Sequence, residues 1–471
     1  MKKNLEFFEK IAEKRDKWKN KNKYYWKDLE NFSNYLIPEH ASVLEVGCGT
    51  GDLLANLKTK NKTGIDFSPK MIEIAKKKYP NIHFQIMDAE NINFERKFDY
   101  IIISNTIGYL EDVQKVFAEL KKVSHSHTKI IVTYYNFLWQ PFFSFGEFLR
   151  LRMKQPEQNW LSRADVKNLL YLAGFDPYKG GERLMVPFYI PVISWFLNKY
   201  VAKLPIFRKL CVTDYVLAKP MPEESETVWK NKYSVSVVIP ARNESGNIEK
   251  AILRTPKMGS HTEIIFIEGN STDDTWQKIK EMVEKYKGTH DIKIGQQEGR
   301  GKGDAVRKGY NMATGDILMI LDADLTVPPE DLPKFYDAIA SGKGEFINGS
   351  RLVYNMEKKA MQFLNIIGNK FFSMMFTWLL DQRFKDTLCG TKVLFKSDYE
   401  YLKAGRKFFG EFDPFGDFDL IFGASKLNLK IVEIPIRYKE RTYGSTNISR
   451  FKHGVILLRM CAFASRKIKF I

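Results

Sequence analysis

The chain has 471 residues, of which 44% are hydrophobic and 28% charged, an ordinary composition for a globular protein. At roughly 150 residues per domain it is too long for one ordinary domain, so we expect two. The formal net charge is +18, and residues 436–471 hold nine Lys/Arg against one acidic residue. A basic, partly apolar tail favours an anionic partner such as phosphate or lipid headgroups. No nucleic-acid recognition module is visible, so we do not expect nucleic acid.

The four cysteines lie far apart, with no Cys-x-x-Cys spacing. This pattern argues against a disulfide framework and a zinc site, and fits a reducing cytosol. The first twenty residues carry charge but lack the apolar stretch of a signal peptide. No apolar run reaches the roughly 18–20 residues that a spanning helix needs. We therefore expect a cytoplasmic protein without a spanning segment.

Apolar, β-rich segments alternate with helical patterns in two series. The first contains SVLEV, TGID, HFQIM, DYIIIS and KIIVTYY and closes near DYVLAKP; the second contains YSVSVVIP, EIIFIE, IKIGQ and DILMILDAD. Strands separated by helices predict parallel sheets. Between the series lies KPMPEESETVWKNK, which has two prolines, an acidic cluster and no periodicity. We predict two doubly wound α/β domains, residues 1–220 and 233–471, joined by a linker at 221–232.

A glycine-rich turn follows the first strand of the first half. The run VLEVGCGTGD carries three glycines, which suit a backbone that turns tightly and lies close to a ligand. The next strand ends at Asp66, nineteen residues after Gly47, where a carboxylate can accept both ribose hydroxyls of an adenosine cofactor. Asp88 follows the third strand, where it can accept from the adenine amino group.

These motifs resemble those of the class I methyltransferases, which use S-adenosylmethionine. The Glu-x-Gly-x-Gly-x-Gly pattern and the acids after the second and third strands occur in that family's order, and FSPKMIEIAKKK is similar to its second helix. The Gly-x-Gly-x-x-Gly spacing of dinucleotide-binding dehydrogenases does not fit. The resemblance implies a Rossmann-like domain over about residues 40–219, with residues 104–106 facing the methyl acceptor. The cofactor contacts it implies are Glu45, Gly47, Gly49, Gly51, Asp66, Asp88 and Ala89.

Two later segments of the first half, NFLWQPFFSFGEFLRLRM and LMVPFYIPVISWFLNKY, are dense in aromatic residues and proline. They fit either a lid over an apolar acceptor or a part of the core, and the sequence leaves both interpretations open. No general base stands out, because methyl transfer is a direct displacement that chiefly needs the nucleophile held in line.

Polar strand ends also mark the second half. EIIFIE ends at Glu268, and the cationic loop GRGKGD, with Lys302, opens a helix where backbone N–H groups and the ammonium can meet phosphate. Asp322 and Asp324 stand at the mouth of an apolar strand, and positions i and i+2 of a strand project to the same side. Paired carboxylates repel unless a cation joins them, so a hard divalent cation that bridges them to a diphosphate is the natural partner.

This set resembles the family 2 glycosyltransferases of the GT-A fold, and most of all the dolichyl-phosphate mannosyl- and glucosyltransferases. The matching motifs, over about residues 234–465, are IPARNE, STDDT, GKGDAVRKG, DADLT, GSR, DTLCG and IPIRYKERTYGST. The resemblance implies inverting transfer from a nucleoside-diphosphate sugar with Mg²⁺ or Mn²⁺ held by Asp322 and Asp324. The nucleotide-sugar contacts it implies are Pro240, Ala241, Glu244, Glu268, Asp273 and Lys302. The family often has Asp-Asp-Gly where this chain has Glu-Gly-Asn at 268–270, which puts the ribose contact in doubt.

The glycosyl acceptor stays open at this point. A phosphate monoester is already an anion and needs no base, so Arg351 and Arg441 would gather charge around it. A sugar hydroxyl would need a carboxylate base, for which Asp386, Asp417 and Asp419 are the candidates.

Two helical patterns suggest contact with a membrane surface. In the segment Met361–Leu380 the polar residues step by three or four and share one face of an otherwise apolar helix. In the tail, Lys452, Arg459 and Arg466 step by seven and form a basic stripe. Such helices either lie in the lipid interface or bury their apolar faces in the domain core. The polar residues of the first helix are Gln362, Asn365, Asn369, Ser373 and Thr377.

Three functions fit these patterns. The first is a bifunctional enzyme that transfers a sugar to a polyprenyl phosphate and methylates a sugar, lipid or pathway neighbour, held at the cytoplasmic face of the membrane. The second transfers the sugar to a hydroxyl of a glycan or lipid. In the third, one half is a cofactor-binding module that regulates or scaffolds the other.

Overall fold

The computed structural model describes residues 4–149, 153–222, 225–351, 363–406, 418–437, 439, 441, 443 and 450–470. Within these ranges, the side chains of residues 226, 363–367, 369 and 450–454 lie outside the described part. Apart from its last two residues, the chain divides into two compact units: unit 1 ends at Met221 and unit 2 runs from Pro222 to Lys469. This division falls within residues 221–232.

Unit 1 is a seven-stranded sheet in the order β3-β2-β1-β4-β5-β7-β6, in which only β7 runs antiparallel to its neighbours. Its strands are β1 (Ser42–Val46), β2 (Asn61–Asp66), β3 (His83–Ile86), β4 (Phe98–Ser104), β5 (Ser124–Tyr135), β6 (Phe175–Arg183) and β7 (Thr213–Pro220). Its helices are α1 (Leu5–Lys21), α2 (Lys23–Leu36), α3 (Asp52–Asn56), α4 (Pro69–Lys78), α5 (Val113–Leu120), α6 (Gln140–Phe148), α7 (Arg163–Leu172) and α8 (Ile193–Lys199). The central strands β1 and β4 are almost wholly buried, with a hydrophobic cluster on each face of the sheet.

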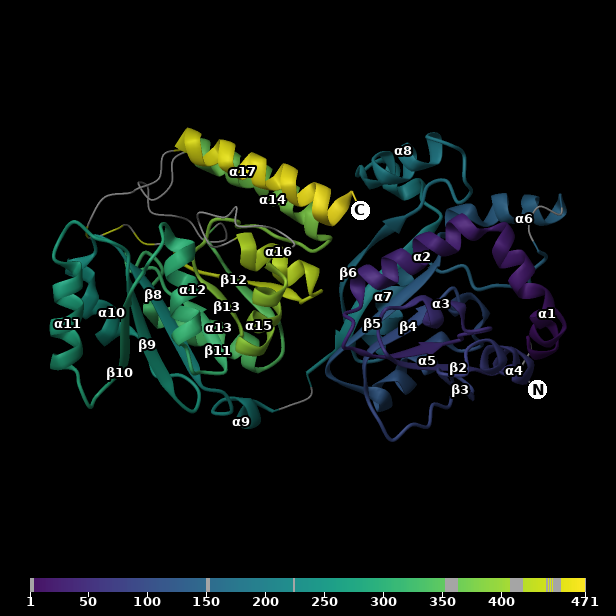
Figure 1. The fold of residues 1–471 in the computed structure, drawn as a ribbon, viewed down its shortest axis with the longest axis horizontal. Coiled ribbons are helices and arrows are strands. Elements are labelled where there is room, and N and C mark those ends of the chain that lie inside the picture. The colour runs from purple at the N-terminus through teal and green to yellow at the C-terminus, as the bar shows by residue number, and fades with distance from the viewer. Residues whose placement is uncertain are drawn as a thin grey trace. The chain divides into compact units, whose positions relative to one another are not determined.

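Unit 2 has a second seven-stranded sheet, in the order β10-β9-β8-β11-β13-β12-β14, with β13 antiparallel to both neighbours (Figure 1). Its strands are β8 (Val235–Ala241), β9 (Thr262–Glu268), β10 (Asp291–Gln296), β11 (Ile317–Ile320), β12 (Phe346–Ser350), β13 (Lys392–Phe395) and β14 (Ile431–Pro435). Its helices are α9 (Glu226–Trp229), α10 (Ile248–Arg254), α11 (Thr275–Lys285), α12 (Lys302–Met312), α13 (Leu332–Ala340), α14 (Phe363–Leu380), α15 (Lys396–Ala404), α16 (Phe418–Lys426) and α17 (Arg450–Ala464).

The prediction of two mixed α/β domains with mainly parallel sheets is confirmed. In each sheet the strand that opens the series, β1 or β8, lies between two parallel neighbours. Because parallel strands that share an edge end together, the loops after β1, β2 and β4 of unit 1 and after β8, β9 and β11 of unit 2 meet at one edge of their sheet.

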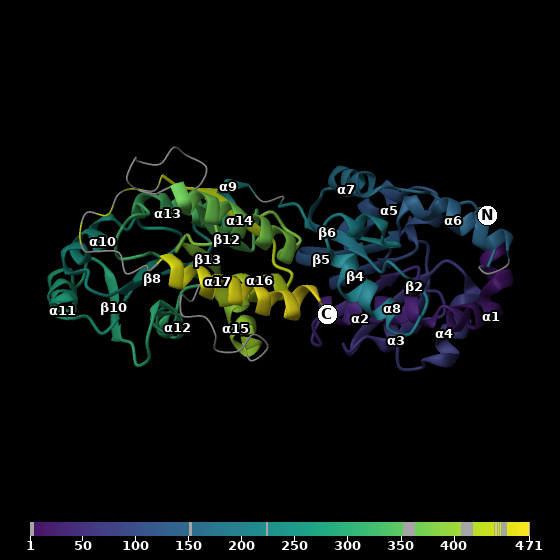
Figure 2. The ribbon, with the colours of Figure 1, turned by 90° about the horizontal axis from the view of Figure 1, so that it is seen from above.

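Helix α14 buries much of its apolar side in the core of unit 2. Phe376 stacks on Phe422 of α16 with ring centroids 5.3 Å apart, and Leu379 and Leu380 are buried with it. Helix α17 lies beside α14, as both views show, and joins the same cluster through Leu457 and three later residues (Figures 1 and 2). Core burial, one of the two interpretations of these helices, therefore accounts for most of their described apolar residues, although Phe371 and Met374 stay exposed.

The basic stripe of the tail lies at the surface where the structure describes it. Arg459, Arg466 and Lys467 are exposed, whereas Lys469 is largely buried with its Nζ 2.5 Å from Asp381 Oδ1. The side chain of Lys452 and the residues Gln362, Asn365 and Asn369 of the polar face lie outside the described part. Among the helices that the structure describes, none is long and apolar enough to cross a bilayer.

Candidate active sites

The glycine loop of unit 1 folds back onto the end of β2. The N–H groups of Gly47 and Cys48 both donate to the carbonyl of Ile65, at 2.8 and 3.0 Å. Gly47 has a φ of +76°, and a Cβ there would lie only 2.5 Å from side-chain atoms of Thr106. Glycine is therefore needed at this position both for its backbone conformation and for space.

Asp66 is buried at the carboxyl end of β2. Its carboxylate accepts hydrogen bonds from the N–H of Gly49 at 2.8 Å and of Ser68 at 3.0 Å. Burial raises the pKa of Asp66 above its usual value, and the two backbone donors partly oppose that shift. Asp66 thus ties the glycine loop to the start of α4, and lone pairs remain for a ligand in the adjoining cavity.

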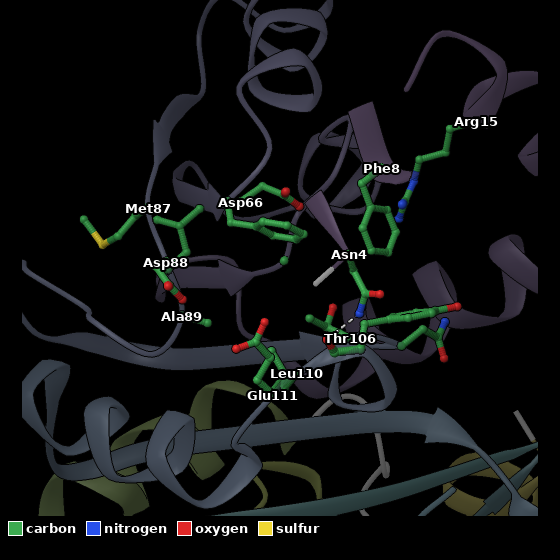
Figure 3. A pocket seen from close by; sticks show the side chains of 15 residues that line it. Asn4, Phe8, Arg15, Asp66, Met87, Asp88, Ala89, Thr106, Leu110 and Glu111 are labelled. Carbon is green, nitrogen blue, oxygen red and sulfur yellow. Dashed lines mark hydrogen bonds between the residues drawn. The ribbon is translucent and has the colours of Figure 1, made fainter. Parts of the chain in front are cut away.

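A cavity with an empty volume of about 700 Å³ opens beside these residues (Figure 3). Four of the seven predicted cofactor contacts line it: Gly47, Asp66, Asp88 and Ala89. Glu45, Gly49 and Gly51 do not line it; Glu45 lies on β1, and the two glycines belong to the loop that follows β1. The other lining residues are Asn4, Phe8, Arg15, Ile65, Phe67, Met87, Asn105, Thr106, Tyr109, Leu110 and Glu111.

Helix α1 forms one wall of this cavity, a feature that the sequence analysis missed. Asn4 precedes the helix and donates from Nδ2 to the carbonyl of Tyr109 at 3.2 Å, and Phe8 packs edge-on against the Tyr109 ring. Arg15 lies so close to Gly49 that a Cβ there would be 3.0 Å from its guanidinium carbon. The apolar positions 7, 8, 11 and 12, spaced for one helix face, were the signal that could have revealed the wall.

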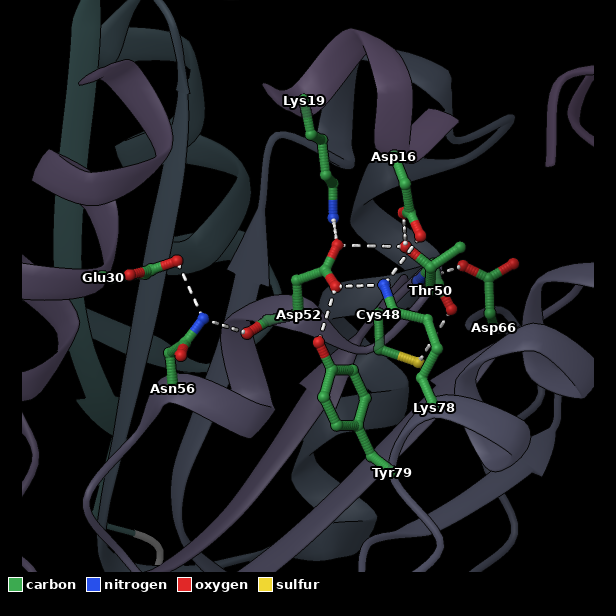
Figure 4. Close-up of polar contacts among 11 residues, drawn as sticks. Asp16, Lys19, Glu30, Cys48, Thr50, Asp52, Asn56, Asp66, Lys78 and Tyr79 are labelled. Carbon is green, nitrogen blue, oxygen red and sulfur yellow. Dashed lines mark hydrogen bonds and ion pairs between the residues drawn. The ribbon is translucent and has the colours of Figure 1, made fainter. Parts of the chain in front are cut away.

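An ionic network fixes α1 and α4 to the glycine loop (Figure 4). Asp52, at the start of α3, lies 2.7 Å from Lys19 Nζ and 2.5 Å from Lys78 Nζ, and Thr50 donates to Asp16 at 2.9 Å. Burial alone would raise the pKa of Asp52, but the two ammonium groups outweigh it and hold the pKa well below its usual value. The loop is thus held in place before a cofactor binds.

Glu45 lies on β1 below the loop and is buried. Burial raises its pKa to about 8, against the opposing charges of Lys19 and Arg15. Its Oε2 has no hydrogen-bond partner among the described residues. A cavity-facing role for Glu45 therefore stays a prediction, and its position beneath the loop favours a structural one.

The predicted methyl-acceptor segment lies at the cavity. Asn105 and Thr106 line it, and Asn105 adopts a φ of +51°. Asn105 Oδ1 accepts from the hydroxyl of Tyr25 at 3.0 Å, while its buried Nδ2 has no partner among the described residues. An unpaired buried donor is costly, so this amide has an N–H group to offer to a ligand in the cavity.

In unit 2 the paired carboxylates follow β11. Lys302, at the start of α12, lies 2.6 Å from Asp322 Oδ1. Gly390 approaches both, since a Cβ there would overlap Asp322 Oδ2 and lie 2.6 Å from Lys302 Nζ. The glycine of the DTLCG motif is therefore part of this site through its lack of a side chain, a role that the sequence analysis did not assign.

Asp324 faces a different cation. Arg441 donates from Nη2 to Asp324 Oδ2 at 2.7 Å and from Nη1 to Glu244 Oε1 at 3.1 Å. Thr326 donates to Asp324 from its backbone and its hydroxyl. Burial raises the pKa of Glu244, although Asn247 and Arg441 oppose the shift. Arg441 thus joins the loop after β8 to the loop after β11.

The predicted nucleoside contacts lie at the ends of β8 and β9. Pro240 and Ala241 are the last two residues of β8, and Glu268 is the last residue of β9. Glu268 is buried and accepts from the N–H of Ser271 at 2.5 Å and from the Gln296 side chain at 3.0 Å. The carboxylate of Glu268 therefore holds the loop that contains Gly269, which stands where the family often has a second Asp.

Asp273 also stabilises a nearby backbone segment, because it accepts a hydrogen bond from the N–H of Thr275 at 3.0 Å at the start of α11. The Thr275 hydroxyl also donates to Asp273 Oδ1, at 2.5 Å, so Oδ2 is the oxygen left for other donors.

Asp386 and Arg351 form a buried ion pair. Arg351 donates to Asp386 from its backbone N–H at 2.9 Å, from Nε at 2.7 Å and from Nη2 at 2.8 Å, and Leu388 N–H adds a fourth bond at 3.0 Å. Burial would raise the pKa of Asp386, but Arg351 reverses this and lowers it. A carboxylate so fully engaged is a poor base. Asp419 lies 3.9 Å from Arg406, and Asp417 lies outside the described residues.

The donor set of unit 2 fits a hard cation that arrives with phosphate. Within the described ranges, no group of three His, Cys, Asp or Glu side chains is arranged to hold a metal. Asp322 and Asp324 supply two carboxylates, which is what Mg²⁺ usually takes from a protein when diphosphate oxygens and waters complete its shell.

Comparison with known proteins identifies both halves. The model of a family described as methyltransferase domain matches residues 37–173, and that of glycosyl transferase family 2 matches residues 236–399. Over 122 residues the chain is 38% identical to the dolichol-phosphate mannosyltransferase of Pyrococcus furiosus, which covers 25% of this chain and 33% of that protein. Over 112 residues it is 33% identical to an undecaprenyl-phosphate 4-deoxy-4-formamido-L-arabinose transferase of Klebsiella pneumoniae, covering 23% and 34%. The chain thus spans about a third of the length of these curated relatives.

Solved structures resemble each half at low identity. A SAM-dependent methyltransferase from Thermotoga maritima is 19% identical, covering 46% of this chain and 98% of that one with a TM-score of 0.36. Glucosyl-3-phosphoglycerate synthase from Mycobacterium tuberculosis, crystallised with Mn²⁺, UDP and phosphoglyceric acid, is 17% identical, covering 51% and 81% with a TM-score of 0.39. The two family matches fall one in each unit, in the order that the sequence motifs predict, so the chain contains a methyltransferase domain followed by a family 2 glycosyltransferase domain.

Proposed function

We propose that unit 2 transfers a sugar, with inversion, from a nucleoside diphosphate and with the help of a divalent cation. The observation that carries this proposal is the pairing of Asp322 with Lys302 and of Asp324 with Arg441 at one sheet edge. Asp322 and Asp324 would hold the cation, which supplies charge stabilisation to the departing diphosphate. With Asp322 and Asp324 bound to the cation, Lys302 and Arg441 would be available to neutralise phosphate charge.

The acceptor of the sugar is a lipid phosphate in this proposal. The relatives named above are dolichol-phosphate and undecaprenyl-phosphate transferases. The Asp386–Arg351 pair supports the same choice, because a hydroxyl acceptor needs a carboxylate base and Asp386 has no free capacity for that work. Asp386 and Arg351 act as positioning residues that hold the loop between β12 and β13.

Unit 1 binds S-adenosylmethionine and transfers its methyl group to a sugar, a lipid or a related pathway molecule. Asp66 and Asp88 would take the ribose and the adenine, as the glycine loop brings both to one cavity. The residues that line the cavity hold the methyl group of the cofactor in line with the acceptor atom, and none of them needs to act as a general base. The acceptor lies on the side of Asn105 and Thr106.

One experiment tests both activities together. The full chain is incubated with a panel of radiolabelled nucleotide sugars, Mg²⁺ or Mn²⁺ and a polyprenyl phosphate, with and without labelled S-adenosylmethionine. We expect sugar label in chloroform-soluble material. Label found only in hydroxyl-linked glycan would reject the lipid-phosphate acceptor, and cofactor binding without methyl transfer to any fraction would favour a regulatory module.

We further propose that helix α17 and the turn after it keep unit 2 at the cytoplasmic face of a membrane. Arg459, Arg466 and Lys467 are exposed beside the exposed Val455 and Leu458. Each cation near an anionic surface contributes about 1 kcal/mol, screened over roughly 8–10 Å. Changing the three cations to Gln should weaken binding to anionic vesicles at low salt in co-sedimentation, and equal binding of both proteins would reject this contact.

A further inference from the structure

The second half of unit 1 displays aromatic side chains instead of burying them. Helix α6 carries four phenylalanines and has no buried residue. Phe142, Phe145 and Phe148 are 66%, 62% and 81% exposed. A short helix is normally stabilised by packing its apolar face against other elements. An apolar face that is exposed to solvent therefore indicates a binding surface for a partner.

A second segment, residues 188–210, has the same character. It contains α8 and two 3-10 turns, and Val192 and Ile206 are 74% and 80% exposed. Its fold is nevertheless well defined: Ser194 Oγ donates to the carbonyl of Phe188 at 2.7 Å, and Asn198 Oδ1 accepts from the N–H of Met185 at 2.8 Å. The exposed apolar residues are thus held out by an ordered loop. The others in this segment are Phe188, Tyr189, Ile193, Trp195, Phe196, Tyr200, Leu204, Phe207 and Leu210.

The two segments form one surface, which we call the aromatic face: residues 137–149 and 188–210. Trp139 Nε1 donates to the carbonyl of Leu210 at 3.0 Å, and Asn136 Nδ2 donates to that of Lys209 at 3.3 Å. Figure 1 shows α6 and α8 at the same edge of unit 1. The core interpretation does not describe most of these side chains, because most of them are exposed. The lid interpretation stays a prediction.

The longer segment of the aromatic face carries cations and no acid. Residues 188–210 contain Lys199, Lys203, Arg208 and Lys209 and no Asp or Glu. Lys209 is exposed and Lys199 is half-buried, whereas Lys203 is buried and Arg208 lies 2.5 Å from Glu182, so Lys199 and Lys209 supply the charge of this face. Lys199 Nζ lies 5.8 Å from the centre of the Trp195 ring. Interfaces between proteins are depleted in lysine, whereas surfaces that enter a bilayer interface combine Trp, Tyr and Phe with lysine and arginine. The composition therefore favours lipid over protein as the partner.

We propose that the aromatic face docks unit 1 onto an anionic lipid bilayer, independently of helix α17. The face reaches the cavity wall through a chain of contacts: the Phe143 ring lies 4.9 Å from that of Tyr135, which lies 5.7 Å from that of Tyr25, whose hydroxyl bonds to Asn105. Docking thereby presents a membrane-borne methyl acceptor to the cavity. This last consequence rests on the methyl transfer proposed above, whereas docking itself does not.

The test uses the full chain and vesicles of phosphatidylcholine with and without phosphatidylglycerol. One variant carries Phe148→Ser, Val192→Ser and Ile206→Ser on the face. A matched control carries Tyr171→Ser, Leu172→Ser and Leu253→Ser, which remove three apolar side chains that are also more than half exposed, outside the aromatic face. We expect the face variant to bind both vesicles at least tenfold more weakly and the control to stay within twofold of the parent.

Two further measurements separate the alternatives. Lys199→Gln with Lys209→Gln should weaken binding only to the anionic vesicles and only at low salt. Calorimetry with S-adenosylmethionine should give the parent's affinity for every variant, which reports an intact unit 1 and a cofactor site that works whether or not docking occurs. Unchanged vesicle binding by the face variant would overturn the proposal. Unchanged binding with loss of a dimer in light scattering would reassign the face to a protein partner.

Discussion

The two candidate sites satisfy their carboxylates in opposite ways. In unit 1, Asp66 accepts from the backbone N–H groups of Gly49, in the glycine loop after β1, and of Ser68, just after its own strand. In unit 2, Asp322 and Asp324 are paired with Lys302 and Arg441, which come from other loops. Backbone donors stay where they are when a ligand binds, but side-chain cations can turn away. The first site is therefore preorganised, whereas the second would have to exchange these cations for the proposed metal ion and diphosphate.

The largest expected effect is that loss of the divalent cation lowers sugar transfer by unit 2 but leaves cofactor binding by unit 1 unchanged. Asp322→Asn with Asp324→Asn, or an excess of EDTA, should lower sugar transfer by about 10³-fold or more, since the cation stabilises the leaving charge. Affinity for S-adenosylmethionine should not change. Assays of both activities on one preparation, with Mg²⁺ or Mn²⁺ added back to the chelated enzyme, measure this. Full sugar transfer in EDTA would contradict it.

The converse variant acts on unit 1 alone. Asp66→Ala should weaken S-adenosylmethionine binding by about 10- to 100-fold, because a charge-assisted hydrogen bond contributes about 1.5–3 kcal/mol. Titration calorimetry measures the affinity, and the sugar-transfer rate of the same variant serves as its control. An unchanged affinity would mean that the cofactor lies elsewhere.

If a metal ion replaces Lys302 as the partner of Asp322, removing Lys302 should change the affinities for the metal and for the nucleotide sugar in opposite directions. Lys302→Gln removes a cation that competes with the metal, so Mn²⁺ should bind the donor-free protein a few-fold more tightly. The same change removes a phosphate contact, so the KM for the nucleotide sugar should rise by about tenfold. Mn²⁺ titration by electron paramagnetic resonance and initial rates give the two values. A fall in both affinities would argue against exchange.

The smallest expected effect concerns Asp52, a carboxylate of the unit 1 loop network that is held by the ammonium groups of Lys19 and Lys78. Its folded pKa lies below the usual value, so its stabilisation is present above about pH 4 and is lost as the pH falls further. Partly exposed pairs contribute about 1 kcal/mol or less. Asp52→Asn should therefore lower the melting temperature slightly at pH 7 and by a smaller amount at pH 3, because the contribution disappears only when the pH falls through the folded pKa, as calorimetry over that range will reveal.

The features predicted correctly from sequence were local ones. The strands that open each series and the glycine loop follow from apolar runs and from glycines that need a positive φ, as at Gly47. Motif order then indicated both domains. Strand β6 was missed because it carries Pro177 and two glycines, which lower strand propensity and are tolerated at a sheet edge.

Contacts between distant residues could not be predicted in this way. The pairing of Asp386 with Arg351 joins residues 35 positions apart, and the approach of Arg15 to Gly49 depends on where α1 packs. Aromatic density in residues 137–149 suggested a lid or a core, since composition does not say which side of a helix is covered. The exposure of that segment became visible only in the structure.

Arg441 has a consequence for the order in which substrates bind. It lies in the segment after β14, bonds to Asp324 and Glu244 together, and has Tyr443 two residues on, whose hydroxyl lies 3.1 Å from Ser245 Oγ. If Asp324 held the proposed cation, one side of this guanidinium would be free for a phosphate of the proposed acceptor. The expected kinetic sequence is therefore ordered, with donor first and acceptor second.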